Sequence, residues 1–142
     1  MRAVMAYFLS VVVAYLVASL IGTLEVMLTL SGFGLTPALA DVLASIGRDW
    51  LGMVGSYLPL IALALLIALP VAARLRQWLG GAPLIWYLSA GFVALIALHI
   101  IMEATLGLVG FAAARSMPGL LLQGFAGAVA GWSFYLTGTG RS

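Results

Sequence analysis

Three ionisable side chains, Glu25, His99 and Glu103, fall inside long apolar stretches of the chain. A charged side chain that faces lipid at the centre of a bilayer costs about 2.5 kcal/mol or more, so each of the three is expected to face a partner or water. His99 and Glu103 are four residues apart, which places both on one face of a helix. An imidazole beside carboxylates could exchange protons or hold a cation near neutral pH.

Two uncharged polar residues, Tyr57 and Gln123, fall at a comparable depth in other apolar stretches. Together with the three ionisable residues they predict an intramembrane polar cluster of Glu25, Tyr57, His99, Glu103 and Gln123. We expect Glu25 to face the third span and to approach His99 or Glu103. Three interpretations stay open. The cluster could be a transport site for protons or cations, or a set of hydrogen bonds that locks the helices together with one glutamate protonated. Alternatively, the two glutamates lie near the outer interface, partly in water.

The same residue types set limits on cofactors and catalysis. Two glutamates and one histidine could bind a metal, but no metal-binding motif accompanies them. The absence of cysteine excludes disulfides, iron–sulfur clusters, zinc–thiolate sites and thiol catalysis. A single histidine cannot supply both axial ligands of a b-type haem within one chain. The sequence also lacks the G-x-S-x-G motif of serine hydrolases. We therefore expect no cofactor, no metal site and no enzyme activity.

The composition indicates which solvent surrounds these side chains. Of the 142 residues, 65% are hydrophobic and 7% are charged, against roughly 25% charged residues in a soluble domain. The mean hydropathy is +1.23. A water-soluble fold of this size needs more charged residues on its surface than this chain contains. Lipid must therefore surround most of the chain. The net charge of +2 is too small and too scattered to suggest nucleic acid as a partner.

Four apolar stretches of sufficient length predict transmembrane helices over about 4–30, 51–75, 83–106 and 118–137. Between the first two, Thr36 and Pro37 are typical of a helix start, and apolar and polar residues then alternate at helical spacing. This segment, about 37–48, is predicted to be an amphipathic helix in the membrane interface. The expected fold is a single all-α membrane domain with four spans and one interfacial helix.

Small residues recur along two of the predicted spans and predict close helix packing. In the first span they form a stripe that Glu25 continues, and in the fourth they include a GxxxG motif. The predicted packing faces are Ala14, Ala18 and Gly22 in the first span, and Gly124, Gly127, Ala128 and Gly131 in the fourth. These faces could pack within the chain, against another protein, or against a second copy of the chain.

The distribution of arginine predicts the orientation. The N-terminus, the second loop and the C-terminus carry four arginines, whereas the first and third loops carry Arg48 and Arg115. Both termini are therefore predicted to lie in the cytoplasm. All six basic residues are arginine, which is typical of a GC-rich bacterial genome, and the expected location is the bacterial inner (plasma) membrane.

Short loops and the absence of a catalytic constellation favour a non-enzymatic protein that acts through helix association. It would be a small accessory subunit of a larger membrane complex, or a homo-oligomer. The expected partners are membrane lipids and other membrane subunits or a second copy. The alternative is a small proton- or cation-coupled transporter or channel that uses Glu25, His99 and Glu103 in the outer leaflet.

Overall fold

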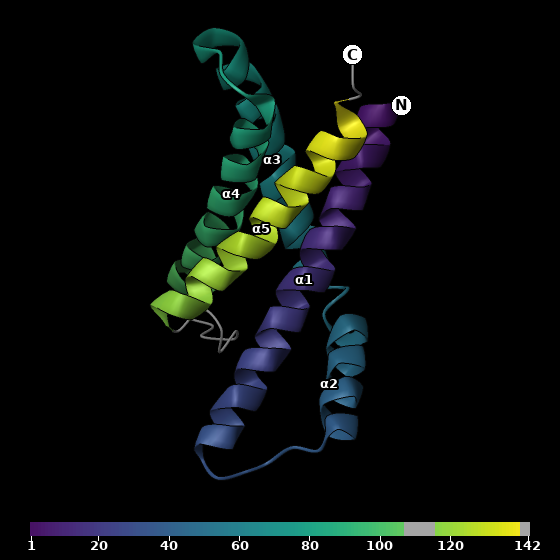
Figure 1. The fold of residues 1–142 in the computed structure, drawn as a ribbon, viewed down its shortest axis with the longest axis vertical. Helices are drawn as coiled ribbons and strands as arrows, with labels where there is room; N and C mark the ends of the chain where they lie inside the picture. Colours follow the sequence, from purple (N-terminus) through teal and green to yellow (C-terminus); the bar gives the residue numbers. More distant parts are fainter. Residues whose placement is uncertain (107–115, 140–142) are drawn as a thin grey trace.

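The computed structural model of the chain describes residues 1–106 and 116–139. In these ranges the chain is helical and contains no strand. Four of the helices are long and apolar enough to cross a membrane, which confirms the prediction of an all-α protein with four candidate spans. The helices are α1 (Arg2–Gly32), α2 (Leu39–Gly52), α3 (Tyr57–Leu79), α4 (Pro83–Leu106) and α5 (Met117–Gly138) (Figure 1).

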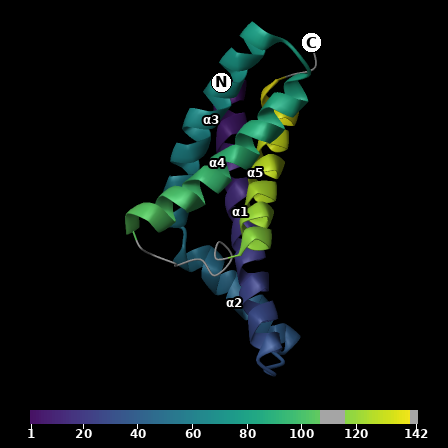
Figure 2. The same ribbon diagram turned by 90° about the vertical axis from the view of Figure 1, so that its left-hand side faces the viewer.

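The four long helices form a bundle in which α5 packs between α1 and α4, and α3 packs against the same two helices. The N-terminus, the C-terminal end of α5 and the turn between α3 and α4 lie at one end of the molecule (Figures 1 and 2). Gly80 and Gly81 form that turn with φ angles of 70° and 97°, a backbone region that favours glycine. This arrangement makes α3 and α4 an antiparallel pair joined by a short turn.

Glycines bring α4 and α5 into direct backbone contact. A Cβ atom added at Gly91 would lie 1.9 Å from the carbonyl oxygen of Gly127, and one added at Gly127 would lie 2.0 Å from that of Gly91. One turn further on, a Cβ at Gly131 would lie 1.9 Å from the carbonyl oxygen of Tyr87. The GxxxG face of α5 thus packs against α4 of the same chain, and glycine is needed on both helices.

The small residues of α1 face α5. Ala14 and Ala18 are fully buried. The side-chain amide of Gln123 donates a hydrogen bond of 3.1 Å to the carbonyl oxygen of Ala18. A Cβ at Gly22 would meet the same amide nitrogen at 3.9 Å, an ordinary contact distance. The glycines of the α5 face and the small residues of α1 thus contact other helices of the same chain, whereas Ala128 is half-buried.

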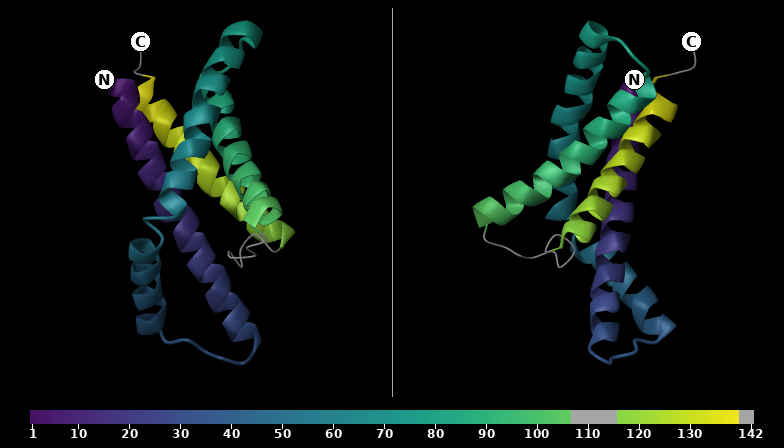
Figure 3. Two further views of the ribbon diagram at one scale, coloured as in Figure 1. Left: turned by 180° about the vertical axis from the view of Figure 1, so that it is seen from behind. Right: turned by 60° about the vertical axis from the view of Figure 1, so that its left-hand side comes forward.

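Part of the chain extends beyond this bundle. The buried residues of α1 end at Thr23, and α2 has no buried residue. The end of α1 and the returning α2 form an antiparallel pair that projects from the bundle, residues 24–52, called here the projecting hairpin (Figures 1 and 3). A helix forms where the amphipathic segment was predicted, and its position in a membrane interface stays a prediction.

The second span differs from its predicted boundaries. α2 continues to Gly52 and α3 begins only at Tyr57. Pro59 consequently lies in the first turn of α3, where its missing N–H leaves no helical hydrogen bond unmade, and Pro70 remains inside the helix. Arg115 and Arg141, which contributed to the predicted orientation, lie outside the described residues.

Candidate functional site

Three of the five residues of the predicted polar cluster come together inside the bundle. The hydroxyl oxygen of Tyr57 lies 3.2 Å from Nε2 of His99 and 3.4 Å from Oε1 of Gln123. All three side chains are at most 3% exposed. The rings of Tyr57 and His99 meet edge to face, with their centroids 5.8 Å apart. We call these three residues the Tyr57–His99–Gln123 cluster.

The cluster links all four long helices. Tyr57 is the first residue of α3, His99 lies on α4, and Gln123 lies on the glycine-rich face of α5. Gln123 also reaches the backbone of α1, where its amide donates to the carbonyl oxygen of Ala18 and lies beside Gly22. One hydroxyl and one amide therefore connect α3, α4, α5 and α1 deep in the bundle.

One hydrogen bond of the cluster fixes the position of a proton on His99. Nδ1 of His99 is 2.7 Å from the carbonyl oxygen of Leu95. A carbonyl can only accept, so Nδ1 carries the hydrogen and Nε2 of a neutral His99 is an acceptor. In that state the Tyr57 hydroxyl lies within hydrogen-bonding distance of two acceptors, Nε2 of His99 and Oε1 of Gln123. A second proton on His99 would let Nε2 donate to Tyr57 and Tyr57 donate to Gln123. The cluster can thus accommodate a neutral or a protonated imidazole.

Glu25 and Glu103 do not join the cluster. Glu25 is half-buried and lies beyond Thr23, on the part of α1 that continues past the bundle. Glu103 is exposed near the end of α4. Within residues 1–106 and 116–139, neither carboxylate makes a hydrogen bond or an ion pair. The same ranges contain no group of three His, Cys, Asp or Glu residues close enough to hold a metal ion. The expectation that Glu25 approaches His99 or Glu103 is therefore not met, and the position of the two glutamates in a membrane interface stays a prediction.

A second polar contact, between α1 and α2, was missed from the sequence. The hydroxyl of Thr23 donates to the Asp49 carboxylate at 2.5 Å, and the hydroxyl of Tyr15 donates to the carbonyl oxygen of Trp50 at 2.5 Å. Tyr15, Ser19 and Thr23 recur every four residues, so they form a polar stripe on one face of α1. That stripe was the available signal that α1 has a polar neighbour.

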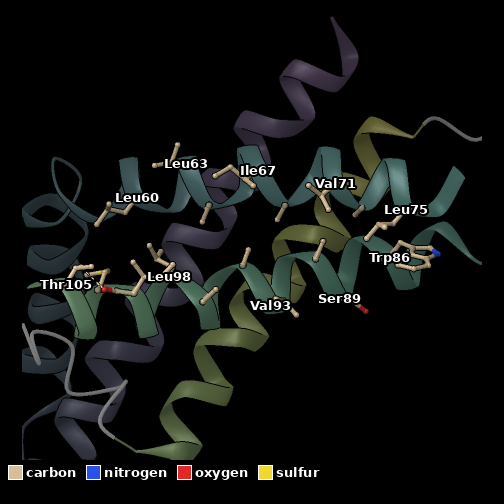
Figure 4. A pocket seen from close by; sticks show the side chains of 18 residues that line it. Leu60, Leu63, Ile67, Val71, Leu75, Trp86, Ser89, Val93, Leu98 and Thr105 are labelled. Atoms are coloured by element: carbon tan, nitrogen blue, oxygen red, sulfur yellow. Dashed lines mark hydrogen bonds between the residues drawn. The ribbon is translucent and has the colours of Figure 1, made fainter. Parts of the chain in front are cut away.

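An apolar groove lies between α3 and α4 (Figure 4). Its volume is about 770 Å³, and its described lining contains no ionisable residue. Leu98 lines the groove, whereas the adjacent His99 points into the bundle toward Tyr57. The groove and the Tyr57–His99–Gln123 cluster are therefore separate features.

Comparison of the chain with protein-family models, curated proteins and solved structures finds no match, so its function is inferred from the geometry above.

Proposed function

We propose that the chain is a non-enzymatic membrane protein that acts through helix association, as a small accessory subunit of a larger membrane complex. The projecting hairpin is its association surface. The observation that carries this proposal is the uncovered apolar surface of the hairpin: Leu28, Phe33 and Leu43 are 71%, 77% and 60% exposed.

The length of α1 supports a location of the hairpin beyond the membrane core. Its 31 residues extend about 46 Å, whereas the hydrocarbon core of a bilayer is about 30 Å thick. Tilting accommodates part of this excess. The remainder lies at the end of α1 after Thr23, where no residue is buried in the described part of the chain and α2 is the adjacent helix. Apolar side chains beyond the hydrocarbon core are exposed to water, and contact with a partner protein buries them.

The attachment of the hairpin supports the same proposal. Thr23 bonds to Asp49, and Tyr15 bonds to the backbone at Trp50. These two contacts hold the far end of α2 to α1, close to the point where the bundle begins. A surface that is already ordered loses less conformational freedom on binding than a loose loop does.

The interior of the bundle supports a structural use of its polar residues. The Tyr57–His99–Gln123 cluster provides hydrogen bonds between helices, and the glycine face of α5 is occupied by α4. The alternative, proton or cation transport through Glu25, His99 and Glu103, has less support because neither glutamate reaches His99.

The charge distribution supports an orientation. Arg2, Arg74 and Arg76 lie at the end of the bundle that contains the N-terminus and the α3–α4 turn. By the positive-inside rule this end faces the cytoplasm. We place the hairpin on the outer face of a bacterial inner membrane, with the apolar edge of α2 at the interface.

Site-specific photo-crosslinking in native membranes tests the association surface. A photo-reactive residue at Leu28 or Leu43 is expected to yield one shared protein adduct. The matched controls, Phe8 on α1 and Leu66 on α3, are also exposed and apolar but lie outside the hairpin, and should react only with lipid. An adduct to a second copy would identify a homo-oligomer. Lipid adducts alone at all four positions would contradict the proposal.

A further inference from the structure

The groove runs along α3 and α4, and side chains of both helices line it (Figure 4). Large exposed side chains such as Leu63, Ile67 and Val93 form its rims. Small buried or half-buried side chains form its floor: Ala64, Ala68, Ala72, Ala90, Ala94 and Ala97. On α3 the lining runs from Leu60 to Leu75, roughly 22 Å along the helix.

One end of this groove is basic. Leu75 and Trp86 line that end, and the indole N–H of Trp86 donates to the carbonyl oxygen of Gly80 at 2.8 Å, which fixes the ring there. Arg74, which is exposed, and Arg76 flank Leu75. Neither arginine lines the groove itself, but both are adjacent in sequence to Leu75 at its end, and neither has an ion-pair partner among the described residues.

The acidic residues of the chain lie far from these two arginines. All four of them lie toward the opposite end of the molecule, in or near the projecting hairpin or late in α4: Glu25, Asp41, Asp49 and Glu103. A second copy in the same membrane orientation would bring its own basic end to the same level. None of these four carboxylates, in this chain or in such a second copy, therefore lies at the level of Arg74 and Arg76.

We propose that the groove binds an anionic diacyl phospholipid, with one acyl chain along the alanine floor and the phosphate beside Arg74 and Arg76. Guanidinium groups bind phosphate oxygens through charge-assisted hydrogen bonds. A single leaflet contributes about 15 Å of hydrocarbon, half of the bilayer core. An acyl chain that starts at this end thus lies along the half of the groove nearest Arg74, which includes the floor at Ala68 and Ala72.

Native mass spectrometry of the full chain in detergent tests this site. The protein is offered equal amounts of phosphatidylglycerol and phosphatidylcholine with identical acyl chains. The first lipid retained should be phosphatidylglycerol. Arg74→Gln should reduce that preference about fivefold, since one arginine near an anionic lipid surface contributes about that factor. The control Arg2→Gln removes a charge at the same end but outside the groove, and should leave the preference unchanged.

A second pair of variants tests the acyl chain. Ala68→Phe fills the floor and should abolish retention of both lipids, whereas Leu66→Phe, on an exposed face of α3 outside the groove, should not. Equal retention of the two lipids, or equal effects of Arg74→Gln and Arg2→Gln, would overturn the proposal. A lipid-free dimer that Ala68→Phe dissociates would also overturn it and would assign the groove to a second copy.

Discussion

The contact between α4 and α5 makes a sharp prediction for Gly127→Ala. The added Cβ would lie 2.0 Å from the carbonyl oxygen of Gly91, whereas ordinary contact begins near 3.4 Å. The clash is with backbone on a neighbouring helix, so no side-chain rotation relieves it. The two helices must instead separate by roughly 1.4 Å, in an interface that is packed as densely as a crystal.

The cost follows from the contacts that such a separation breaks. A gap of about 0.5–1 Å already removes a quarter to a half of the dispersion attraction between facing atoms. Fully buried Leu95, Ala126 and Ala130 are on these two helices. Overpacking of a core typically costs about 1–3 kcal/mol, and we expect about 3 kcal/mol here because the backbone itself is displaced.

Equilibrium unfolding in mixed detergent, followed by tryptophan fluorescence, measures this cost. Gly22→Ala is the matched control, since its Cβ would meet only the Gln123 amide at 3.9 Å. It should leave the free energy of unfolding unchanged or raise it by up to about 1 kcal/mol through helix propensity. If Gly127→Ala is as stable as the parent, or if Gly22→Ala is equally damaging, the close approach of α4 and α5 is refuted.

Three further substitutions separate the polar features. Tyr57→Phe removes the hydroxyl shared by His99 and Gln123 and should lower the free energy of unfolding by about 1–3 kcal/mol, because a buried hydrogen bond between helices is lost. An unchanged value would argue against the cluster. Thr23→Val removes the hydroxyl that holds α2 to α1, so amide hydrogen exchange should accelerate in α2 and stay constant in α4; equal rates in parent and variant would count against this contact. Glu103→Gln should change stability by less than about 0.5 kcal/mol, as expected for an exposed side chain; a loss above 1 kcal/mol would place Glu103 in a buried network.

The sequence was sufficient to locate the four candidate spans, because a helix that crosses lipid needs a long apolar run. Few other structures contain an apolar run of that length. It was less informative about their ends. Between the end of α2 and the start of α3, apolar Met53 and Val54 are followed only by Gly55 and Ser56, which interrupt the apolar run briefly. Hydropathy does not register the intervening turn, so the predicted second span began too early.

The comparison of depths along the spans was partly informative. It suggested that Tyr57, His99 and Gln123 lie at a similar level, and the structure brings them together. The same comparison predicts Glu25 at this level, because the apolar run continues past Glu25. α1 is longer than the bundle, and an apolar run does not reveal where a helix loses its neighbours.

The close contact of Gly91 with Gly127 could be anticipated on one side only. Gly127 belongs to a GxxxG motif, which indicates a face for close approach. Gly91 stands alone in its helix, and a lone glycine is common in membrane helices. Which helix meets the motif depends on the topology of the whole bundle, so the choice between a partner within the chain and a separate protein required the three-dimensional arrangement.

The mass of the particle that contains this chain provides the most direct test of its association through the projecting hairpin. Membranes are extracted into lipid nanodiscs without detergent, and the particle is compared with the 14.8 kDa of a single chain. The parent and the control Leu66→Ser should remain with another membrane protein, whereas Leu28→Ser combined with Leu43→Ser should release the chain alone. A parent chain that is already alone, or a hairpin variant that stays bound, would contradict the proposed function.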